Sequence, residues 1–421
     1  MKAIKGDIVY SIGINDLAIS ENSYLLYEKE KVIGVVSELP TTVDNIDIED
    51  YAGNLIIPGL YDLHLHAPQY AYRGLGMDME LIQWLNSHTF NEEIKYSDIE
   101  YAKKSYSIFV DDLINSATVR ACIFATIHTE ATILLMKMLE DKGFRGYVGK
   151  VSMNRNAPEL LCENDAVKEA ISWLNQASSL NGNISPIITP RFIPSCSNEL
   201  LIDLAQIQKE TRLPLQSHLS ENLSEVKWVE ELIKDCDFYG DAYYKYGLFG
   251  QNGKTVMAHC VYSSDLEIKL IKKMGVYVAH CPLSNSNLSS GIAPVRKFVD
   301  NGINLGIGTD VAGGESISMF KAMAEAVKAS KLRWRLEDET LKPLTFEEVF
   351  YMATKGGGSF FGKAGSFESG YYMDTLVLDD SELRCPYKLS TRQRIERFIY
   401  LGDERLIKAK YIAGKKIGGR K

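Results

Sequence analysis

The chain has 421 residues, of which 45% are hydrophobic and 24% are charged, and its formal net charge is -8. This composition is that of a globular protein, and the acidic balance argues against general binding to nucleic acid or anionic membranes. The chain also has no apolar run of membrane-spanning length and no secretory signal, and its cysteines lack a Cys-x-x-Cys pair, which favours the cytoplasm.

Both ends of the chain carry short strand patterns. The predicted terminal strands are 7–10, 23–28, 31–36, 372–378, 397–400 and 409–413. Neither terminal piece is large enough to bury a core by itself. We therefore expect 1–57 and 370–421 to pair into one small, discontinuous β-sandwich domain.

The middle of the chain alternates short apolar, β-branched runs with longer helical patterns. The predicted strands are 60–66, 119–126, 146–153, 184–192, 214–220, 255–261, 276–282 and 304–311. Helical patterns follow them, as at 99–116 and 195–211. Repeated β-then-α units of this number predict a (β/α)8 TIM-type barrel of the α/β class over 58–369.

Histidines are concentrated at the ends of these predicted strands. His64 and His66 lie two apart on the first strand, so their side chains point to the same face. His218 falls at the end of the fifth strand, and Asp310 at the end of the eighth. Barrel enzymes build their sites at this rim. The four side chains form a nitrogen and oxygen set suited to one zinc ion per chain, with Fe2+ possible on the same ligands.

Further polar residues follow the same strands. Glu221 is predicted to be a proton shuttle, and the alternative is a surface glutamate that begins a helix. His259 is predicted to complete the metal shell or to bond water at the metal, and the alternative is a hydrogen-bonded core histidine. For His280, a role in the site and a purely structural hydrogen bond are both open. Cys260 and Cys281 each follow a histidine, but adjacent strand residues face opposite ways, which argues against a thiolate site.

Two glycine-rich segments do not predict a nucleotide site. Gly306-x-Gly308 follows a strand but has Val311 where a dinucleotide loop needs its third glycine. The glycine run at 355–358 has no phosphate-loop pattern around it, and a tight turn or close packing explains it better.

Several sequence blocks carry a family resemblance. They are Pro58 to Tyr70, Phe124 to Thr129, Thr189 to Phe192, Gln216 to Asn222, Val256 to His259, Ala279 to Pro282 and Gly308 to Gly314. Together they resemble the metal-dependent amidohydrolase superfamily, and within it the guanine deaminases, over nearly the whole chain. The His-x-His and Thr-Asp elements are shared by the superfamily, whereas the Pro-Arg-Phe and Ala-Thr-Ile-His blocks are typical of guanine deaminases.

The resemblance implies a set of functional residues. His64, His66, His218 and Asp310 match the family's metal ligands, with His259 close to the metal or its water. Gln69, Arg191 and Phe192 fall where the family contacts the purine, together with His218, Glu221 and Asp310. Arginine offers paired donors to the O6 and N7 acceptors of guanine, and phenylalanine can pack on the ring. Without the resemblance, a salt-bridged arginine and a core phenylalanine would be the preferred interpretations.

The reaction implied is zinc-dependent hydrolysis of guanine to xanthine and ammonia, in purine catabolism or salvage, by a cytoplasmic homodimer. Metal-activated water would attack C2, with Asp310 as the base and Glu221 as the proton shuttle. The alternative within enzymes is another one-metal aminohydrolase, acting on a pterin, a triazine or another nucleobase.

Two more distant alternatives stay open. A two-metal cyclic amidase needs a bridging ligand, commonly a carbamylated lysine at the end of the fourth strand, and 189–192 contains none. Lys150, on the third strand, is the one lysine that keeps a two-metal site possible. A non-catalytic scaffold is disfavoured because it would not need Glu221 beside a complete set of metal ligands.

Overall fold

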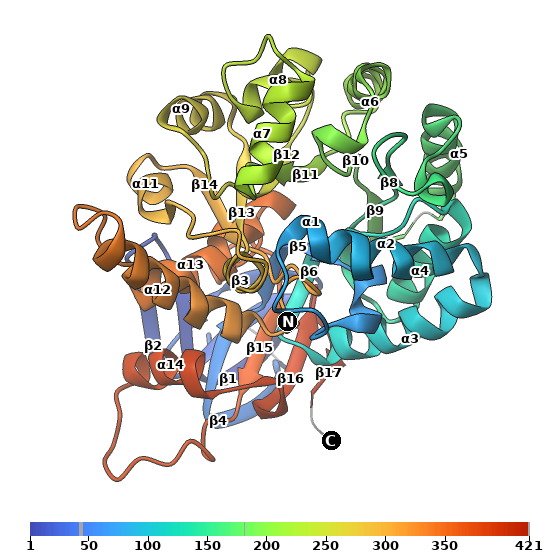
Figure 1. Cartoon of the computed structure of the whole chain (residues 1–421). Helices are drawn as coiled ribbons and strands as arrows, with labels where there is room; N and C mark the ends of the chain where they lie inside the picture. The colour runs from blue at the N-terminus through green and yellow to red at the C-terminus, as the bar shows by residue number, and fades with distance from the viewer. Residues whose placement is uncertain (42–44, 181, 420–421) are drawn as a thin grey trace.

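The computed structural model describes residues 1–41, 45–180 and 182–419. An eight-stranded parallel sheet forms the centre of the larger part of the molecule, and its strands can be followed in Figure 1. Its strands are β5 (Leu60–His66), β6 (Thr118–Phe124), β7 (Arg145–Gly149), β9 (Ile184–Pro186), β11 (Leu215–Leu219), β12 (Thr255–His259), β13 (Tyr277–His280) and β14 (Asn304–Ile307). The hydrogen-bonded order runs β11-β12-β13-β14-β5-β6-β7-β9, and a parallel bridge between Ile188 and Leu215 joins its two ends. The predicted (β/α)8 barrel is confirmed.

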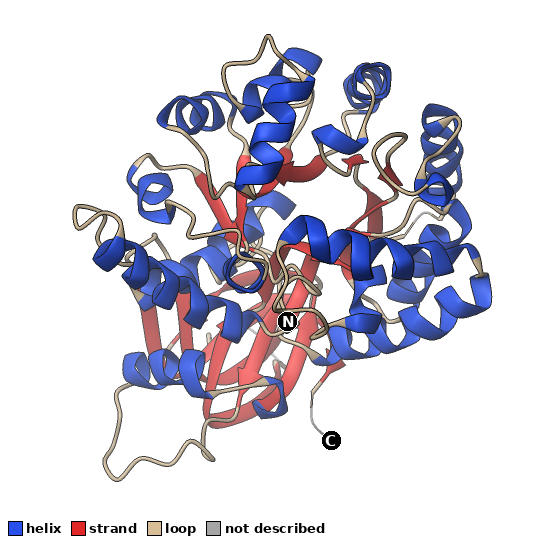
Figure 2. Ribbon diagram, viewed as in Figure 1, coloured by secondary structure: helices blue, strands red, loops and turns tan. Residues whose placement is uncertain are grey.

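Helices surround this ring of strands (Figure 2). They are α3 (Ile99–Asn115), α4 (Thr129–Asp141), α5 (Ala166–Ser178), α6 (Asn198–Thr211), α7 (Leu223–Leu232), α8 (Tyr239–Tyr246), α9 (Asp265–Met274), α10 (Pro282–Asn287), α11 (Val295–Asp300), α12 (Met319–Leu336) and α13 (Phe346–Tyr351). Because helices cover the outside and side chains fill the inside, β5 and β6 are buried along their whole length. In the described part of the chain, no helix combines the length and the hydrophobicity needed to cross a bilayer.

Two of the predicted barrel strands are interrupted. The run at 146–153 divides into β7 and β8 (Val151–Ser152), and the run at 184–192 divides into β9 and β10 (Thr189–Pro190). β8 and β10 pair with each other in a separate two-stranded sheet. Pro186 ends β9 and Pro190 ends β10, and neither has a backbone N–H to donate to a ladder.

The two chain termini form a separate sheet. Its strands are β1 (Lys2–Ser11), β2 (Leu17–Glu28), β3 (Lys31–Val36), β4 (Asp47–Pro58), β15 (Thr375–Leu378), β16 (Ile407–Ile412) and β17 (Lys415–Gly418). The expected β-sandwich takes the form of one continuous sheet with the order β17-β16-β15-β4-β1-β2-β3. β4 pairs parallel with β1 and antiparallel with β15, so the first and last parts of the chain share one sheet.

The strand predicted at 397–400 is wrong, because this segment belongs to helix α14 (Thr391–Leu401). Ser390 and Gln393 form a capping box at its start, and Ile395, Phe398 and Ile399 are buried at helical spacing. The Phe398 ring packs edge-on against Phe320 of α12, with the ring centroids 5.0 Å apart. A short run of apolar residues therefore fits a strand or a helix equally well, and only the capping residues before it favour the helix.

Asp374 joins the terminal sheet to the barrel. Its buried carboxylate accepts hydrogen bonds from the Tyr61 hydroxyl at 2.9 Å and from Arg120 Nε at 2.7 Å. The same carboxylate accepts from the backbone N–H of Ala413 at 2.7 Å. One charged group thus holds β5, β6 and the end of β16 in fixed positions.

We expect Asp374→Asn to lower the free energy of unfolding by about 3–5 kcal/mol, because it leaves the Arg120 charge buried and unpaired. Urea unfolding of both proteins measures the difference. Glu339→Gln is the control, since Glu339 and its partner Arg335 are 70% and 61% exposed. An exposed pair is worth less than about 1 kcal/mol, so equal effects of the two changes would contradict the role of Asp374.

Candidate active site

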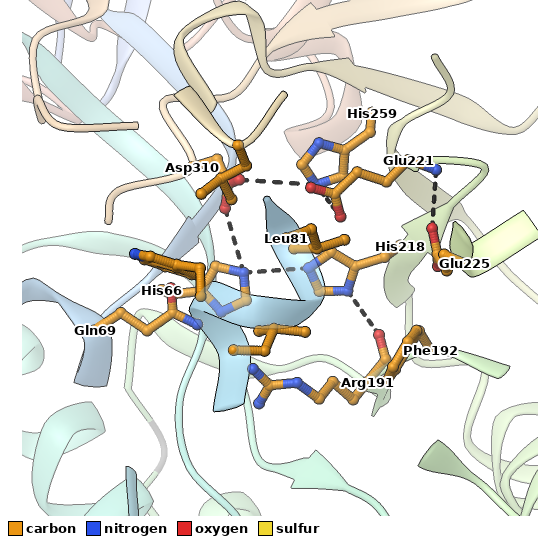
Figure 3. A pocket seen from close by; sticks show the side chains of 13 residues that line it. His66, Gln69, Leu81, Arg191, Phe192, His218, Glu221, Glu225, His259 and Asp310 are labelled. Carbon is orange, nitrogen blue, oxygen red and sulfur yellow. Dashed lines mark hydrogen bonds and ion pairs between the residues drawn. The ribbon is translucent and has the colours of Figure 1, made fainter. Parts of the chain in front are cut away.

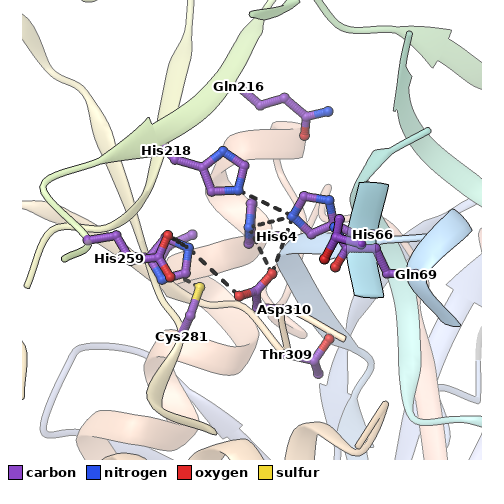
Figure 4. Close-up of polar contacts among 12 residues, drawn as sticks. His64, His66, Gln69, Gln216, His218, His259, Cys281, Thr309 and Asp310 are labelled. Atoms are coloured by element: carbon purple, nitrogen blue, oxygen red, sulfur yellow. Dashed lines mark hydrogen bonds and ion pairs between the residues drawn. The ribbon is translucent and has the colours of Figure 1, made fainter. Parts of the chain in front are cut away.

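The ends of three barrel strands and the loop after β14 bring a group of histidines and one aspartate together (Figure 4). His64 Nε2 and His66 Nε2 lie 3.2 Å apart, and His218 Nε2 lies 3.3 Å from His66 Nε2. Asp310 Oδ1 lies 3.1 Å from His64 Nε2 and 3.3 Å from His66 Nε2. Ligand atoms at about 2.0–2.1 Å from a tetrahedral zinc ion lie about 3.3 Å apart, so this spacing fits one such ion.

The protonation of the three imidazoles also fits a metal. Burial lowers the pKa of His64, His66 and His218, which keeps the rings neutral. His218 Nδ1 donates to the Arg191 carbonyl at 2.6 Å, so its Nε2 lone pair faces the cluster. Burial alone would raise the pKa of Asp310, but the neighbouring His64 holds it below its usual value, so the carboxylate is ionised.

His259 and Glu221 lie next to this cluster. His259 Nε2 is 3.5 Å from Glu221 Oε2 and 3.7 Å from Asp310 Oδ2. His259 Nδ1 donates to Asn285 Oδ1 at 2.9 Å, which fixes the ring with Nε2 toward the two carboxylates. Burial and the nearby charges of Glu225 and Asp310 raise the pKa of Glu221 well above its usual value. Glu221 can therefore carry a proton near neutral pH.

The backbone is strained where it presents these groups. His259 has φ 73° and Asp310 has φ 48°, both in the left-handed region that costs about 1–2 kcal/mol for a residue with a Cβ. Asp310 is held there by its N–H, which donates to the His64 carbonyl at 2.8 Å. The strands end in tight turns that aim the side chains at the cluster.

A pocket opens onto the cluster, and the six residues expected to contact a purine all line it (Figure 3). Its lining is His66, Gln69, Leu81, Trp84, Leu85, Arg191, Phe192, His218, Glu221, Glu225, His259, Leu288 and Asp310. Leu81, Trp84 and Leu85 come from helix α1 (Leu81–Trp84) and the π-helical turn η2 (Leu85–Thr89), which give the pocket an apolar wall. An apolar slot with a few convergent polar groups is the usual form of a small-molecule site.

Three sequence candidates do not line this pocket. His280 is buried, and in the described part of the chain neither ring nitrogen has a hydrogen-bond partner, but it does not line the pocket. Lys150 is buried in an ion pair with Glu163 and also lies outside the pocket lining. Cys281 was discounted, yet its sulfur lies within 4.8 Å of ligand nitrogens of His64 and His259. Burial raises the pKa of this thiol well above its usual value, which keeps it protonated while no metal is bound.

A model of the amidohydrolase family matches residues 55–417. The chain belongs to the amidohydrolase family. It is 34% identical to a guanine deaminase of Dictyostelium discoideum, with 99% of this chain and 98% of that protein covered. It is 33% identical to a guanine deaminase of Escherichia coli strain K12, with 88% of this chain and 85% of that protein covered.

Among solved structures, this amidohydrolase is similar to a guanine deaminase from C. acetobutylicum with bound guanine in the active site. The two are 46% identical with a TM-score of 0.96, covering 99% of this chain and 100% of the other. The resemblance to guanine deaminases within the amidohydrolases is confirmed, and with it the prediction that the chain is a hydrolase.

Two further residues of this amidohydrolase, Asp62 and Gly308, contact the backbone or side chain of the cluster residues and help to position them. The buried Asp62 carboxylate accepts from Thr309 Oγ at 2.5 Å and from the His64 N–H at 3.1 Å, so it fixes both sides of the cluster. Gly308 lies so close that a Cβ there would stand 2.8 Å from His64 Cβ. Asp62 was not among the residues predicted from the sequence, although it lies two residues before His64, at the same spacing that separates His64 from His66.

Glu225 was also missed. It closes a capping box with Asn222 at the start of α7, and its carboxylate accepts from the Glu221 N–H at 3.0 Å. The Tyr239 hydroxyl donates to the other oxygen at 2.6 Å. The Asn-x-x-Glu spacing in the sequence signals the capping box, but not that its carboxylate would face the pocket.

Proposed function

We propose that this protein is a guanine deaminase that hydrolyses guanine to xanthine and ammonia, in purine catabolism or salvage, with one zinc ion per chain. The observation that carries the proposal is that one pocket joins the histidine and aspartate cluster to Gln69, Arg191 and Phe192. The similarity to a guanine deaminase solved with guanine bound supports the choice of substrate.

His64, His66, His218 and Asp310 would hold the metal, with His259 as a neighbour that bonds water beside it. A zinc ion bound there acts as a Lewis acid that brings the pKa of water toward neutrality. An iron(II) ion would accept the same ligands.

Each remaining pocket residue has a role that follows from its chemistry. Arg191 donates to O6 and N7 of the purine, and Phe192 packs against its ring. Phe192 is held by Trp228, with the ring centroids 6.2 Å apart. These contacts orient the base so that C2 and its amine face Glu221 and Asp310.

Two carboxylates then move protons. The neighbouring histidines favour the charged form of Asp310, so it is ionised. As a free carboxylate it can accept a proton from the attacking water. The raised pKa of Glu221 lets it carry a proton, which it delivers to ring N3. Glu221 then takes the proton of the new C2 hydroxyl and passes it to the amine, which leaves as ammonia, and the water proton held by Asp310 restores Glu221. His259, between the two carboxylates, holds the attacking oxygen as C2 becomes tetrahedral.

Zinc-loaded protein incubated with guanine should release ammonia and xanthine, and elemental analysis should find one metal per chain. Adenine, cytosine and pterin form the comparison panel. Two metals per chain would favour a two-metal amidase, and absence of turnover across the panel would favour a scaffold. The expected homodimer and cytoplasmic location stay predictions, and solution mass measurement tests the first.

A further inference from the structure

Glu93 is buried behind the purine pocket and contacts two of the residues that line it. It ends the short helix α2 (Phe90–Glu93), which lies between η2 and α3. Its Oε2 accepts from Arg191 NH1 at 2.7 Å, and its Oε1 accepts from Gln69 Nε2 at 3.3 Å. The Glu93 and Arg191 side chains are only 1% and 4% exposed, so the pair is almost fully removed from water.

The same helix supports the Arg191 guanidinium in a second way. Phe90 lies three residues before Glu93, on the same face of the helical turn. Its ring centroid is 5.5 Å from Arg191 Cζ. One turn of chain thus packs against the guanidinium and binds one of its nitrogens, and leaves the other donors of Arg191 for the pocket.

The charge of Glu93 decides which end of the Gln69 amide faces the pocket. A carboxylate can only accept hydrogen bonds, so Gln69 must turn its NH2 group toward Glu93. No hydrogen bond joins Gln69 Oε1 to another described residue, and Gln69 lines the pocket. The pocket therefore contains an acceptor from Gln69 next to donors from Arg191.

This pattern matches guanine and opposes purines that carry an amine at position 6. Guanine offers N1–H as a donor and O6 and N7 as acceptors. In a 6-aminopurine, N1 is an acceptor and the group at position 6 is a donor, so both contacts would be reversed. A buried polar group left without its partner is strongly disfavoured, which makes such a site selective.

We propose that Glu93 is a positioning residue that sets the preference for 6-oxopurines by fixing the Gln69 amide and the Arg191 guanidinium in these orientations. The inference rests on the proposed function and adds to it a residue that does not touch the substrate. Glu93 acts through its two partners.

The test is Glu93→Gln, which keeps the shape of the side chain. The new amide oxygen still accepts from Arg191, so its NH2 group faces Gln69, whose own amide must turn over and present NH2 to the pocket. We expect KM for guanine to rise about 10- to 100-fold with kcat changed far less. The ratio of kcat/KM for guanine to that for 2,6-diaminopurine, which keeps the reacting C2 amine, should fall about tenfold or more.

The double variant Glu93→Gln with Gln69→Glu restores an acceptor toward the pocket and should recover most of the lost guanine preference. Gln69→Glu alone places two carboxylates together, so this single variant should not recover the guanine preference. Glu92→Gln is the matched control on the same helix, since Glu92 pairs with Lys95 at 2.7 Å and does not line the pocket. Metal content and thermal unfolding are compared for all variants.

The outcomes separate the two proposals. A wild-type protein that does not hydrolyse guanine overturns the proposed function. An active wild type whose Glu93→Gln variant keeps its guanine KM and its substrate ratio overturns the role of Glu93 alone. Loss of preference without recovery in the double variant also overturns it, because a purely structural defect gives that result.

Discussion

Glu221→Gln is expected to lower kcat for guanine by about 10²- to 10⁴-fold while the protein keeps its metal. Glutamine has the same shape but cannot give or take the proton that N3 and the departing amine require. The metal should stay, because the four proposed ligands are unchanged. Steady-state kinetics together with elemental analysis on the same samples measures both quantities.

The matched control for this change is Glu230→Gln, at an exposed position on helix α7, which begins two residues after Glu221. It should leave kcat near the wild-type value. Near-normal turnover in Glu221→Gln would refute the proton-shuttle role, and loss of zinc in that variant would instead make Glu221 part of the metal site.

His218→Ala is expected to lower the affinity for zinc by more than about 100-fold. A loss of about 100-fold is the upper end of what is caused by changes that only reorient a ligand. The reason is that its Nε2 is one of the donors that meet at the cluster, 3.3 Å from His66 Nε2. After dialysis the variant should hold little zinc and show little activity. Added zinc should raise its unfolding temperature much less than that of the wild type depleted of metal.

Cys281→Ala is the control for the metal site, because the thiol lies near His64 and His259 without belonging to the proposed ligand set. It should retain one zinc per chain. If Cys281→Ala lost the metal and His218→Ala kept it, the ion would belong to the group formed by His64, His259 and Cys281.

Much of the barrel could be predicted from local patterns. Continuous apolar, β-branched runs mark strands that are buried on both faces, and in a barrel their carboxyl ends must meet at one rim. For that reason His64, His218 and Asp310 could be placed together although they lie far apart in the chain. The prediction failed at 397–400, where four residues are too few to separate a strand from part of a helix.

The supporting residues of the site could not be predicted in the same way. Glu93 pairs with Arg191, which lies 98 positions away in the sequence, and no local sequence pattern around either residue predicts this pairing. A glutamate in a helical segment most often faces solvent, and only the fold, which brings Arg191 beside it, gives this one a buried partner.

The sequence by itself determined the order of strands and helices and the polar residues at the strand ends, because both follow from periodicity along one segment. The tertiary structure alone decided which buried charges pair, as in Arg120 with Asp374 and Arg191 with Glu93. It also decided which nitrogen of each histidine faces the cluster. These choices depend on desolvation and on hydrogen bonds between distant segments, and such contacts exist only once the chain has folded.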